Sequence, residues 1–319
     1  MAGMRITVCY LYPDIMSTYG DHGNLETVLR RCEWRNIAVD VTELRLGDRL
    51  APDQADLIMI GDGGESQQHL VAPDLCKVKG ECIRESVARG AAALAVGGGY
   101  ELFGRFCQPE RGAELRGIGL FDAWTVRQNA VLSGHYSTIS AAHADRFIGE
   151  LVVRWRDTLL VGFENHGGGT YLGAAAQPLG QVVSGHGNNG DGTEGIILGS
   201  AVGTYLRGPC LPKNPALADF LIGAAVIRRY GVADLPPLAD DLEEAARGDA
   251  MRRAQDAARG VRAARVKVRL SAFAQASLEH GRNARIRATR AALHVSARRR
   301  PAGGVTLKRS GNARSGGSR

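Results

Sequence analysis

The stretch Ala91–Gly104, AAALAVGGGYELFG, constrains the fold more than any other part of the sequence. A short apolar run leads directly into three glycines, and an apolar segment with helical spacing follows. This pattern predicts a buried strand, a tight turn and a helix. Such a turn is typical of a nucleophile elbow, in which strained backbone lifts one side chain to the top of a parallel sheet. The residue at the tip is Gly97, so the sequence predicts a catalytic turn whose tip carries no side chain.

Alternating strand and helix patterns surround this turn. Strand-like runs are found at residues 5–12, 37–44, 55–60 and 91–96, and helical spacing at 24–35 and 74–89. Continuously apolar strands that alternate with helices indicate a parallel sheet covered on both faces. After Gly117 the strand-like runs are short and separated by turns, which favours a more antiparallel second half. A last strand-like run at 195–205 and a helix at 214–230 close the predicted α/β core.

Composition excludes several classes of protein. The 319 residues contain no run of eighteen uncharged apolar residues and no signal-peptide pattern at the N-terminus, so we expect a cytoplasmic protein without a membrane span. The six cysteines show no C-x-x-C pair and no metal-ligand spacing, which favours reduced thiols and no metal. The glycine runs at 97–99 and 167–169 lack the features of phosphate-binding loops, so we expect no cofactor and no nucleotide.

Charge divides the chain into two parts. Residues 251–319 carry 18 Lys and Arg against two acidic residues, a net charge of +16, whereas residues 1–250 have a net charge of −9. An Ala/Arg-rich helix is predicted at 242–269. A basic tail can bind nucleic acid. The tail has few aromatic residues, however, and its Gly/Ser/Arg-rich end is typical of disorder, so nucleic-acid binding is only a weaker alternative.

Four separated motifs, in one consistent order, resemble a known family. They are AVGGGYELFG at 95–104, a predicted loop GFENHGGGTYLG at 162–173, a predicted turn GHGNN at 185–189, and GTYLRGPCLPKNP at 203–215. Together they resemble the CobB/CobQ-like branch of class I glutamine amidotransferases, and within it the glutaminase subunits of lipid II isoglutaminyl synthases. The resemblance implies a class I glutamine amidotransferase-like (flavodoxin-like) sheet with helices on both faces over residues 4–232. A linker and a basic, partly disordered C-terminal extension would then occupy 233–319.

The resemblance also implies an activity and a partner. Members of this family hydrolyse glutamine to glutamate and ammonia. The ammonia passes to a Mur-ligase-like synthetase subunit (MurT type), which uses ATP to amidate the D-glutamate of the peptidoglycan stem peptide. The two subunits form a heterodimer. The chemistry needs a thiolate nucleophile, a histidine that takes its proton, and backbone N–H donors for the oxyanion.

The resemblance places both catalytic positions on residues that cannot do this chemistry. The nucleophile of the family's V-C-G-G-Y-Q pattern falls on Gly97, and the histidine of its G-T-Y-L-H-G pattern falls on Arg207. Glycine cannot attack a carbonyl, and a protonated arginine cannot act as a general base. The glutamine of the first pattern is replaced by Glu101. Cys107 and Cys210 are too badly placed to substitute, and we expect both to be ordinary buried thiols.

Three further positions are candidates for ligand binding. Arg146 matches the family's substrate-binding arginine, after an apparent insertion at about 131–144, and the alternative is an exposed surface arginine. Gly61 or Gly63 could donate its backbone N–H to an anion, and the alternative is simply a tight strand-to-helix turn. For His166 a structural or subunit-contact role is favoured over catalysis.

Two main hypotheses of function remain open from the sequence. The chain is either a glutaminase subunit by descent whose activity is impaired or lost, or a non-catalytic pseudo-amidotransferase that serves as a scaffold for its Mur-ligase-like partner. In both, glutamine or a similar amino acid is the expected small-molecule ligand.

Overall fold

A sheet of six strands forms the centre of the fold. The computed structural model describes residues 3–127, 146–232, 234–257 and 259. The strand order is β13–β14–β4–β3–β1–β2, and all neighbours are parallel except β13 and β14. The strands are β1 (Arg5–Leu11), β2 (Ala38–Leu44), β3 (Leu57–Ile60), β4 (Ala92–Val96), β13 (Ile196–Leu198) and β14 (Ala201–Thr204). Every residue of β3, β4 and β14 is buried, because this part of the sheet is covered on both faces.

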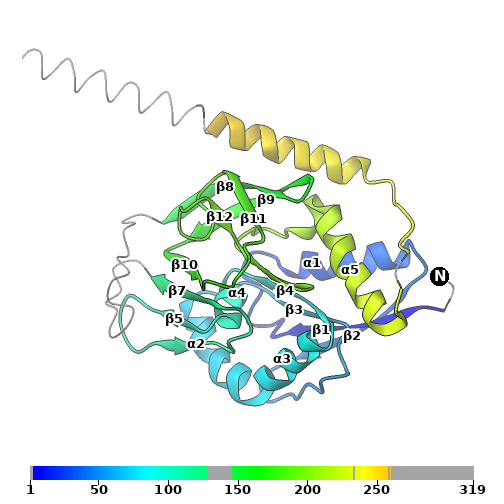
Figure 1. The fold of residues 1–319 in the computed structure, drawn as a ribbon, viewed down its shortest axis with the longest axis horizontal. Coiled ribbons are helices and arrows are strands. Elements are labelled where there is room, and N and C mark those ends of the chain that lie inside the picture. Colours follow the sequence, from blue (N-terminus) through cyan, green and yellow to red (C-terminus); the bar gives the residue numbers. More distant parts are fainter. Residues whose placement is uncertain (1–2, 128–145, 233, 258, 260–319) are drawn as a thin grey trace, which may run out of the picture. The chain divides into compact units, whose positions relative to one another are not determined.

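Helices cover the two faces of this sheet, as Figure 1 shows. The helices α1 (His22–Glu33) and α5 (Pro215–Tyr230) lie together on one side. On the other side are α2 (Glu65–Asp74), the π-helix η1 (Leu75–Lys79) and α3 (Gly80–Ala88). The predicted α/β sheet with helices on both faces is therefore confirmed.

The helix predicted at 74–89 is wrong at its beginning. The helical segment starts at Glu65, directly after Gly64, whose backbone is extended. The sequence of α2, ESQQHLVAPD, is mostly polar and contains Pro73, so it shows no apolar stripe from which a helix could be recognised. The π-helix η1 then follows without a break.

Two smaller sheets make up most of the second half, and their pairing is mainly antiparallel, as predicted. The first has the order β10–β7–β5–β6 and the second β12–β11–β8–β9, and the β5–β7 pair is parallel. Their strands are β5 (Phe106–Gln108), β6 (Leu115–Arg116), β7 (Ala123–Arg127), β8 (Phe147–Trp155), β9 (Thr158–His166), β10 (Gly168–Leu172), β11 (Gly180–Ser184) and β12 (Thr193–Glu194). The 3-10 helix η3 (Leu211–Lys213) precedes α5.

Two predictions for this half need correction. The loop predicted at 162–173 is wrong for residues 168–172, which form β10, whereas residues 162–166 end β9, one of the short strand-like runs predicted after Gly117. Its glycines suggested a loop, but Gly168 lies against the backbone of Val126 on β7, where a side chain would not fit. The run 195–205 is not one strand. It forms the antiparallel pair β13–β14, which turns at Gly199 with φ +57°.

The predicted turn after β4 is present. The chain leaves β4, passes through Gly97 with φ 55° and ψ −114°, and enters the short helix α4 (Gly98–Phe103). Residues other than glycine rarely adopt this backbone conformation. A Cβ atom on Gly99 would lie 2.7 Å from the carbonyl oxygen of Gly61, and one on Gly98 would overlap the carbonyl of Gly63. The glycines after β3 and after β4 therefore allow the two turns to touch through their backbones.

A further helix, residues 241–257, packs against the second small sheet. Ala250 and Ala254 are buried there against Val152 and Val161. Side-chain contacts add to this packing, since Arg247 donates to the Thr158 hydroxyl at 2.8 Å. The predicted helix at 242–269 is thus present over its described part.

The segment before this helix is held by buried arginines of α1. Arg31, only 2% exposed, forms ion pairs with Asp219 at 2.7 Å and with Asp240 at 2.5 Å. Arg35 pairs with Asp219 and donates to the carbonyl of Pro236.

Among the described helices, none combines the length and the apolar character that crossing a membrane requires. The predicted insertion at about 131–144 and the basic tail from residue 260 onward lie outside the described residues. The prediction of tail-mediated nucleic-acid binding concerns that undescribed part.

The packing of residues 241–257 leads to a stability prediction. Ala254→Asp would bury a carboxylate without a partner. We therefore expect it to lower the free energy of unfolding by about 2 kcal/mol, or to detach the helix from the sheet. Ala257→Asp on the exposed side of the same helix is the matched control and should change stability by less than about 0.5 kcal/mol. Thermal unfolding and limited proteolysis after residue 240 would measure both. Equal behaviour of the two variants would contradict the observed packing.

Candidate functional site

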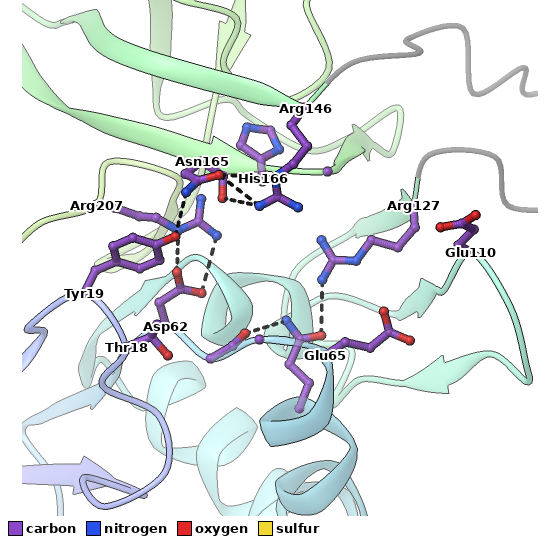
Figure 2. Close-up of a pocket in the computed structure, with 14 residues that line it drawn as sticks. Thr18, Tyr19, Asp62, Glu65, Glu110, Arg127, Arg146, Asn165, His166 and Arg207 are labelled. Atoms are coloured by element: carbon purple, nitrogen blue, oxygen red, sulfur yellow. Dashed lines mark hydrogen bonds and ion pairs between the residues drawn. The ribbon is translucent and has the colours of Figure 1, made fainter.

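A cavity of about 410 Å³ opens at the carboxyl ends of the central strands. This is the edge of a parallel sheet at which α/β proteins commonly bind ligands. Its wall contains residues from the turn after β3, the start of α2, the end of β7, the segment before β8, the end of β9 and the segment after β14 (Figure 2). The lining residues are Thr18, Tyr19, Asp62, Gly63, Gly64, Glu65, Gln68, Glu110, Arg127, Arg146, Asn165, His166, Gly167 and Arg207.

Asp62 occupies the space next to Gly97. A Cβ atom on Gly97 would overlap the Asp62 carboxylate and would lie 2.8 Å from Nη2 of Arg207. Oδ1 of Asp62 also accepts a hydrogen bond of 2.5 Å from the backbone N–H of Gly98, the first residue of α4. Gly97 itself is not among the lining residues, because the carboxylate lies between it and the cavity.

Arg207 is the partner of this carboxylate. Its Nε donates to Oδ2 of Asp62, its Nη2 lies 3.3 Å from Oδ1, and both side chains are at least 95% buried. Burial alone would lower the pKa of Arg207, but the Asp62 carboxylate outweighs it and raises that pKa. The guanidinium also lies near the rings of Tyr19 and Tyr205, 5.5 and 5.3 Å from their centroids.

One donor of Arg207 is unused. Its backbone pairs with Phe163 on β9, which fixes the position of the side chain. Nη1 is buried and has no hydrogen-bond partner among the described residues. The ion pair therefore leaves the Nη1 amino group of a permanently charged side chain, with its two N–H donors, without a hydrogen bond.

A second buried ion pair lies on the opposite side of the cavity. Glu101 of α4 accepts two hydrogen bonds from Arg127, at 2.9 and 2.6 Å. Gln68 and the hydroxyl of Tyr205 donate to the same carboxylate at 2.7 and 3.0 Å. A fully bonded buried carboxylate of this kind holds α2, α4, β7 and the segment after β14 together.

His166 is buried as a neutral imidazole. Its ring stacks on Tyr205 at 3.7 Å between centroids, and Nδ1 lies 2.7 Å from the carbonyl oxygen of Gly168. Burial, and secondarily the charge of Arg207, lower its pKa to about 3. The predicted turn at 185–189 is present, and there His186 holds the buried Glu164 through its backbone N–H and Nδ1.

The structure brings some of the predicted site residues together and separates others. Arg146, Arg207 and Gly63 line the cavity, whereas Gly61 does not and packs against Met16 and Asp21 instead. Arg146 is bonded to the side chain and the carbonyl of Asn165, and forms no ion pair with any carboxylate in the described part of the chain.

Sequence reasoning missed several residues of this site. Asp62 was overlooked although it stands between glycines directly after a buried strand, at the edge where ligand-binding side chains gather. Arg127 and Gln68 carry no comparable signal, because each lies in a polar run typical of a surface.

The two thiols considered from the sequence do not reach the cavity. Cys107 and Cys210 are buried, as predicted, and burial raises the pKa of each to about 12. Neither lines the cavity, and the lining residues include no Cys or Ser. Nor do three His, Cys, Asp or Glu side chains of the described ranges gather in a way that could hold a metal ion.

Comparisons with known proteins agree with the motifs. The model of the CobB/CobQ-like glutamine amidotransferase domain matches residues 7–215. The protein named lipid II isoglutaminyl synthase (glutamine-hydrolyzing) subunit GatD from Staphylococcus aureus (strain N315) is 34% identical over 228 residues, which is 70% of this chain and 86% of that protein. The protein of the same name from Streptococcus pneumoniae (strain ATCC BAA-255 / R6) is 31% identical over 241 residues, 75% of this chain and 87% of that protein.

Among solved structures, PurLQS from Thermotoga maritima aligns with a TM-score of 0.43 and 14% identity, over 70% of this chain and 97% of that one. The family match and the two relatives, each more than 30% identical, confirm the resemblance found in the sequence and the predicted fold class. The chain belongs to the CobB/CobQ-like glutamine amidotransferase family.

Proposed function

We propose that this chain is the amidotransferase subunit of a lipid II isoglutaminyl synthase-type complex and that its own site does not hydrolyse glutamine. The family membership and the names of the two relatives support the first part. The Asp62 carboxylate beside Gly97, paired with Arg207, carries the second part.

Three requirements of glutamine hydrolysis fail together at this site. Gly97, at the proposed nucleophile position, has no thiol, and Arg207, at the proposed histidine position, cannot accept a proton. The N–H after a nucleophile elbow normally stabilises the oxyanion, but here the N–H of Gly98 donates to the Asp62 carboxylate. A negative group at this place would repel a developing oxyanion instead of stabilising it.

The remaining cavity still suits a free amino acid. Arg146 has no carboxylate partner in the described ranges and would bind the α-carboxylate of the ligand. Glu65 and Glu110 line the same cavity and would attract the α-ammonium group. In this proposal the chain binds a glutamine-like ligand without cleaving it. The Mur-ligase-like partner of MurT type then receives ammonia from another source, and this subunit acts as a scaffold.

The first expected result concerns chemistry at the site. The purified chain, with or without its synthetase partner, should release glutamate from glutamine no faster than buffer does. A chloroketone analogue of glutamine should form no thioether with a cavity residue, because none of those that line it carries a thiol. A coupled glutamate assay would measure turnover, and peptide mass spectrometry would detect adducts. Turnover of glutamine, or a thioether on a cavity residue, would overturn the proposal.

The second expected result concerns recovery of glutaminase activity. Gly97→Cys with Arg207→His should remain inactive, because Asp62 loses its arginine partner, repels the thiolate beside it and still occupies the N–H of Gly98. Adding Asp62→Gly should raise glutamate release by at least about tenfold over the double variant.

The double variant is the matched control of this experiment. If it were as active as the triple variant, Asp62 would not obstruct the site. If neither variant were active, the rest of the cavity would no longer fit glutamine.

The third expected result concerns binding of glutamine. Arg146→Ala should weaken glutamine binding, measured by calorimetry, by about tenfold, because one charge-assisted pair is lost. Arg154→Ala is the control, since Arg154 is exposed on β8 and does not line the cavity. An equal effect of both changes, or none of either, would argue against the role of Arg146.

A further inference from the structure

A second cavity, of about 620 Å³, is lined by the end of α2, whereas the site described above is lined by the start of that helix. One wall is formed by the end of α2, the π-helix η1 and α3, and the other by β6 and the turn that follows it. Its lining residues are Ala72, Pro73, Cys76, Lys77, Arg84, Arg105, Leu115, Arg116, Gly117, Ile118 and Gly119.

The charge of this cavity differs in sign from that of the chain around it. Lys77, Arg84, Arg105 and Arg116 line it, and none of the lining residues is acidic. Yet residues 1–250 as a whole have a net charge of −9. These exposed like charges around one hollow make its electrostatic potential positive, which favours an anion between them.

Most of these cations have no counter-ion among the residues that the structure describes. Arg105 pairs with Asp122 at 2.8 Å. Lys77, Arg84 and Arg116 form no ion pair with a carboxylate of the residues that the structure describes. Three charged groups are therefore available to a ligand.

The walls are held in place by close backbone contacts. Arg84 donates to the carbonyl oxygen of Ile118 at 2.7 Å, which orients its guanidinium at the rim. A Cβ atom on Gly117 would lie 2.7 Å from the carbonyl oxygen of Leu102, so the turn is tightly seated on the core. The thiol of Cys76 donates to the carbonyl oxygen of Arg116 at 3.3 Å and joins the two walls.

The π-helix is an independent feature of the same wall. Residues Leu75–Lys79 form a π-helical turn, a rare backbone form that is frequent at functional sites. It places Cys76 and Lys77 in the lining of the cavity.

We propose that this cavity binds an organic diphosphate, with the phosphates held by Lys77, Arg84 and Arg116. Guanidinium groups bind phosphate oxygens in pairs, and an ammonium group adds a point charge, so these side chains match a multiply charged phosphate better than a single carboxylate. Ala72, Pro73, Leu115 and Ile118 supply an apolar surface for the organic part. The volume lies within the range of small-molecule sites.

This binding would not use a glycine-rich phosphate loop, which the sequence lacks. Side chains from three separate elements would hold the phosphates instead of consecutive backbone N–H groups. The site shares no lining residue with the amino-acid cavity and is independent of the function proposed above.

The test measures binding of inorganic pyrophosphate and of ADP to the full-length protein by calorimetry at low salt. We expect saturable binding of at least one of them that weakens as salt is added. Lys77→Glu with Arg116→Glu should reduce the affinity by at least about tenfold. Tighter binding of ADP than of pyrophosphate would show that the apolar wall contacts the organic group. Equal binding of the two would show that the cavity recognises the phosphates alone.

The control is Arg49→Glu with Arg154→Glu, which changes the net charge equally at two exposed arginines outside both cavities. It should change the affinity by less than about twofold. Thermal unfolding without ligand identifies a variant that fails to fold, in which case Arg116→Gln alone replaces it. Absence of saturable binding of both probes at millimolar concentration, or an equal loss in the control, would overturn the proposal.

Discussion

The contact between the turn after β3 and the turn after β4 determines the arrangement of the whole site. Gly61 and Gly63 meet Gly98 and Gly99 so closely that a Cβ atom on either of the last two would collide with backbone. Between these glycines Asp62 contributes a side chain to the interface. Its carboxylate is placed beside Gly97 and must be paired, because a buried unpaired charge is strongly destabilising. Arg207, at the end of the neighbouring strand β14, provides that pairing.

The site is built on charge pairs that cross between elements. Asp62–Arg207 joins the ends of β3 and β14, and Glu101–Arg127 joins α4 to β7. In each, both side chains are largely buried, so each carboxylate depends on its own arginine. The hydrogen bonds of Gln68 and Tyr205 to Glu101 extend the second pair to α2 and to the segment after β14. The cavity is thus lined by groups whose positions are fixed before any ligand arrives.

The local pattern of apolar residues and glycines was sufficient to predict the central sheet, the turn at Gly97 and the antiparallel character of the second half of the core. These elements bury continuous apolar runs, and such runs can be recognised from residues that are neighbours in the sequence. The pairing of Asp62 with Arg207 could not be predicted in the same way, because 145 residues separate them and no spacing rule connects them. The strand β10 was missed because its glycines pack against β7 instead of forming a loop. The start of α2 was missed because its sequence is polar.

The Asp62–Arg207 pair also limits how the site could change by single substitutions. A thiol introduced at position 97 would meet the carboxylate. Removal of the carboxylate alone would leave the guanidinium buried without a partner, and removal of the guanidinium alone would leave the carboxylate without one. Each broken pair of this kind costs roughly 3–5 kcal/mol, a large part of the stability of an ordinary domain. No single replacement leads from this arrangement to a cysteine–histidine dyad without such a penalty. Under the function proposed above, the pair would therefore make it difficult for the site to acquire such a dyad one residue at a time.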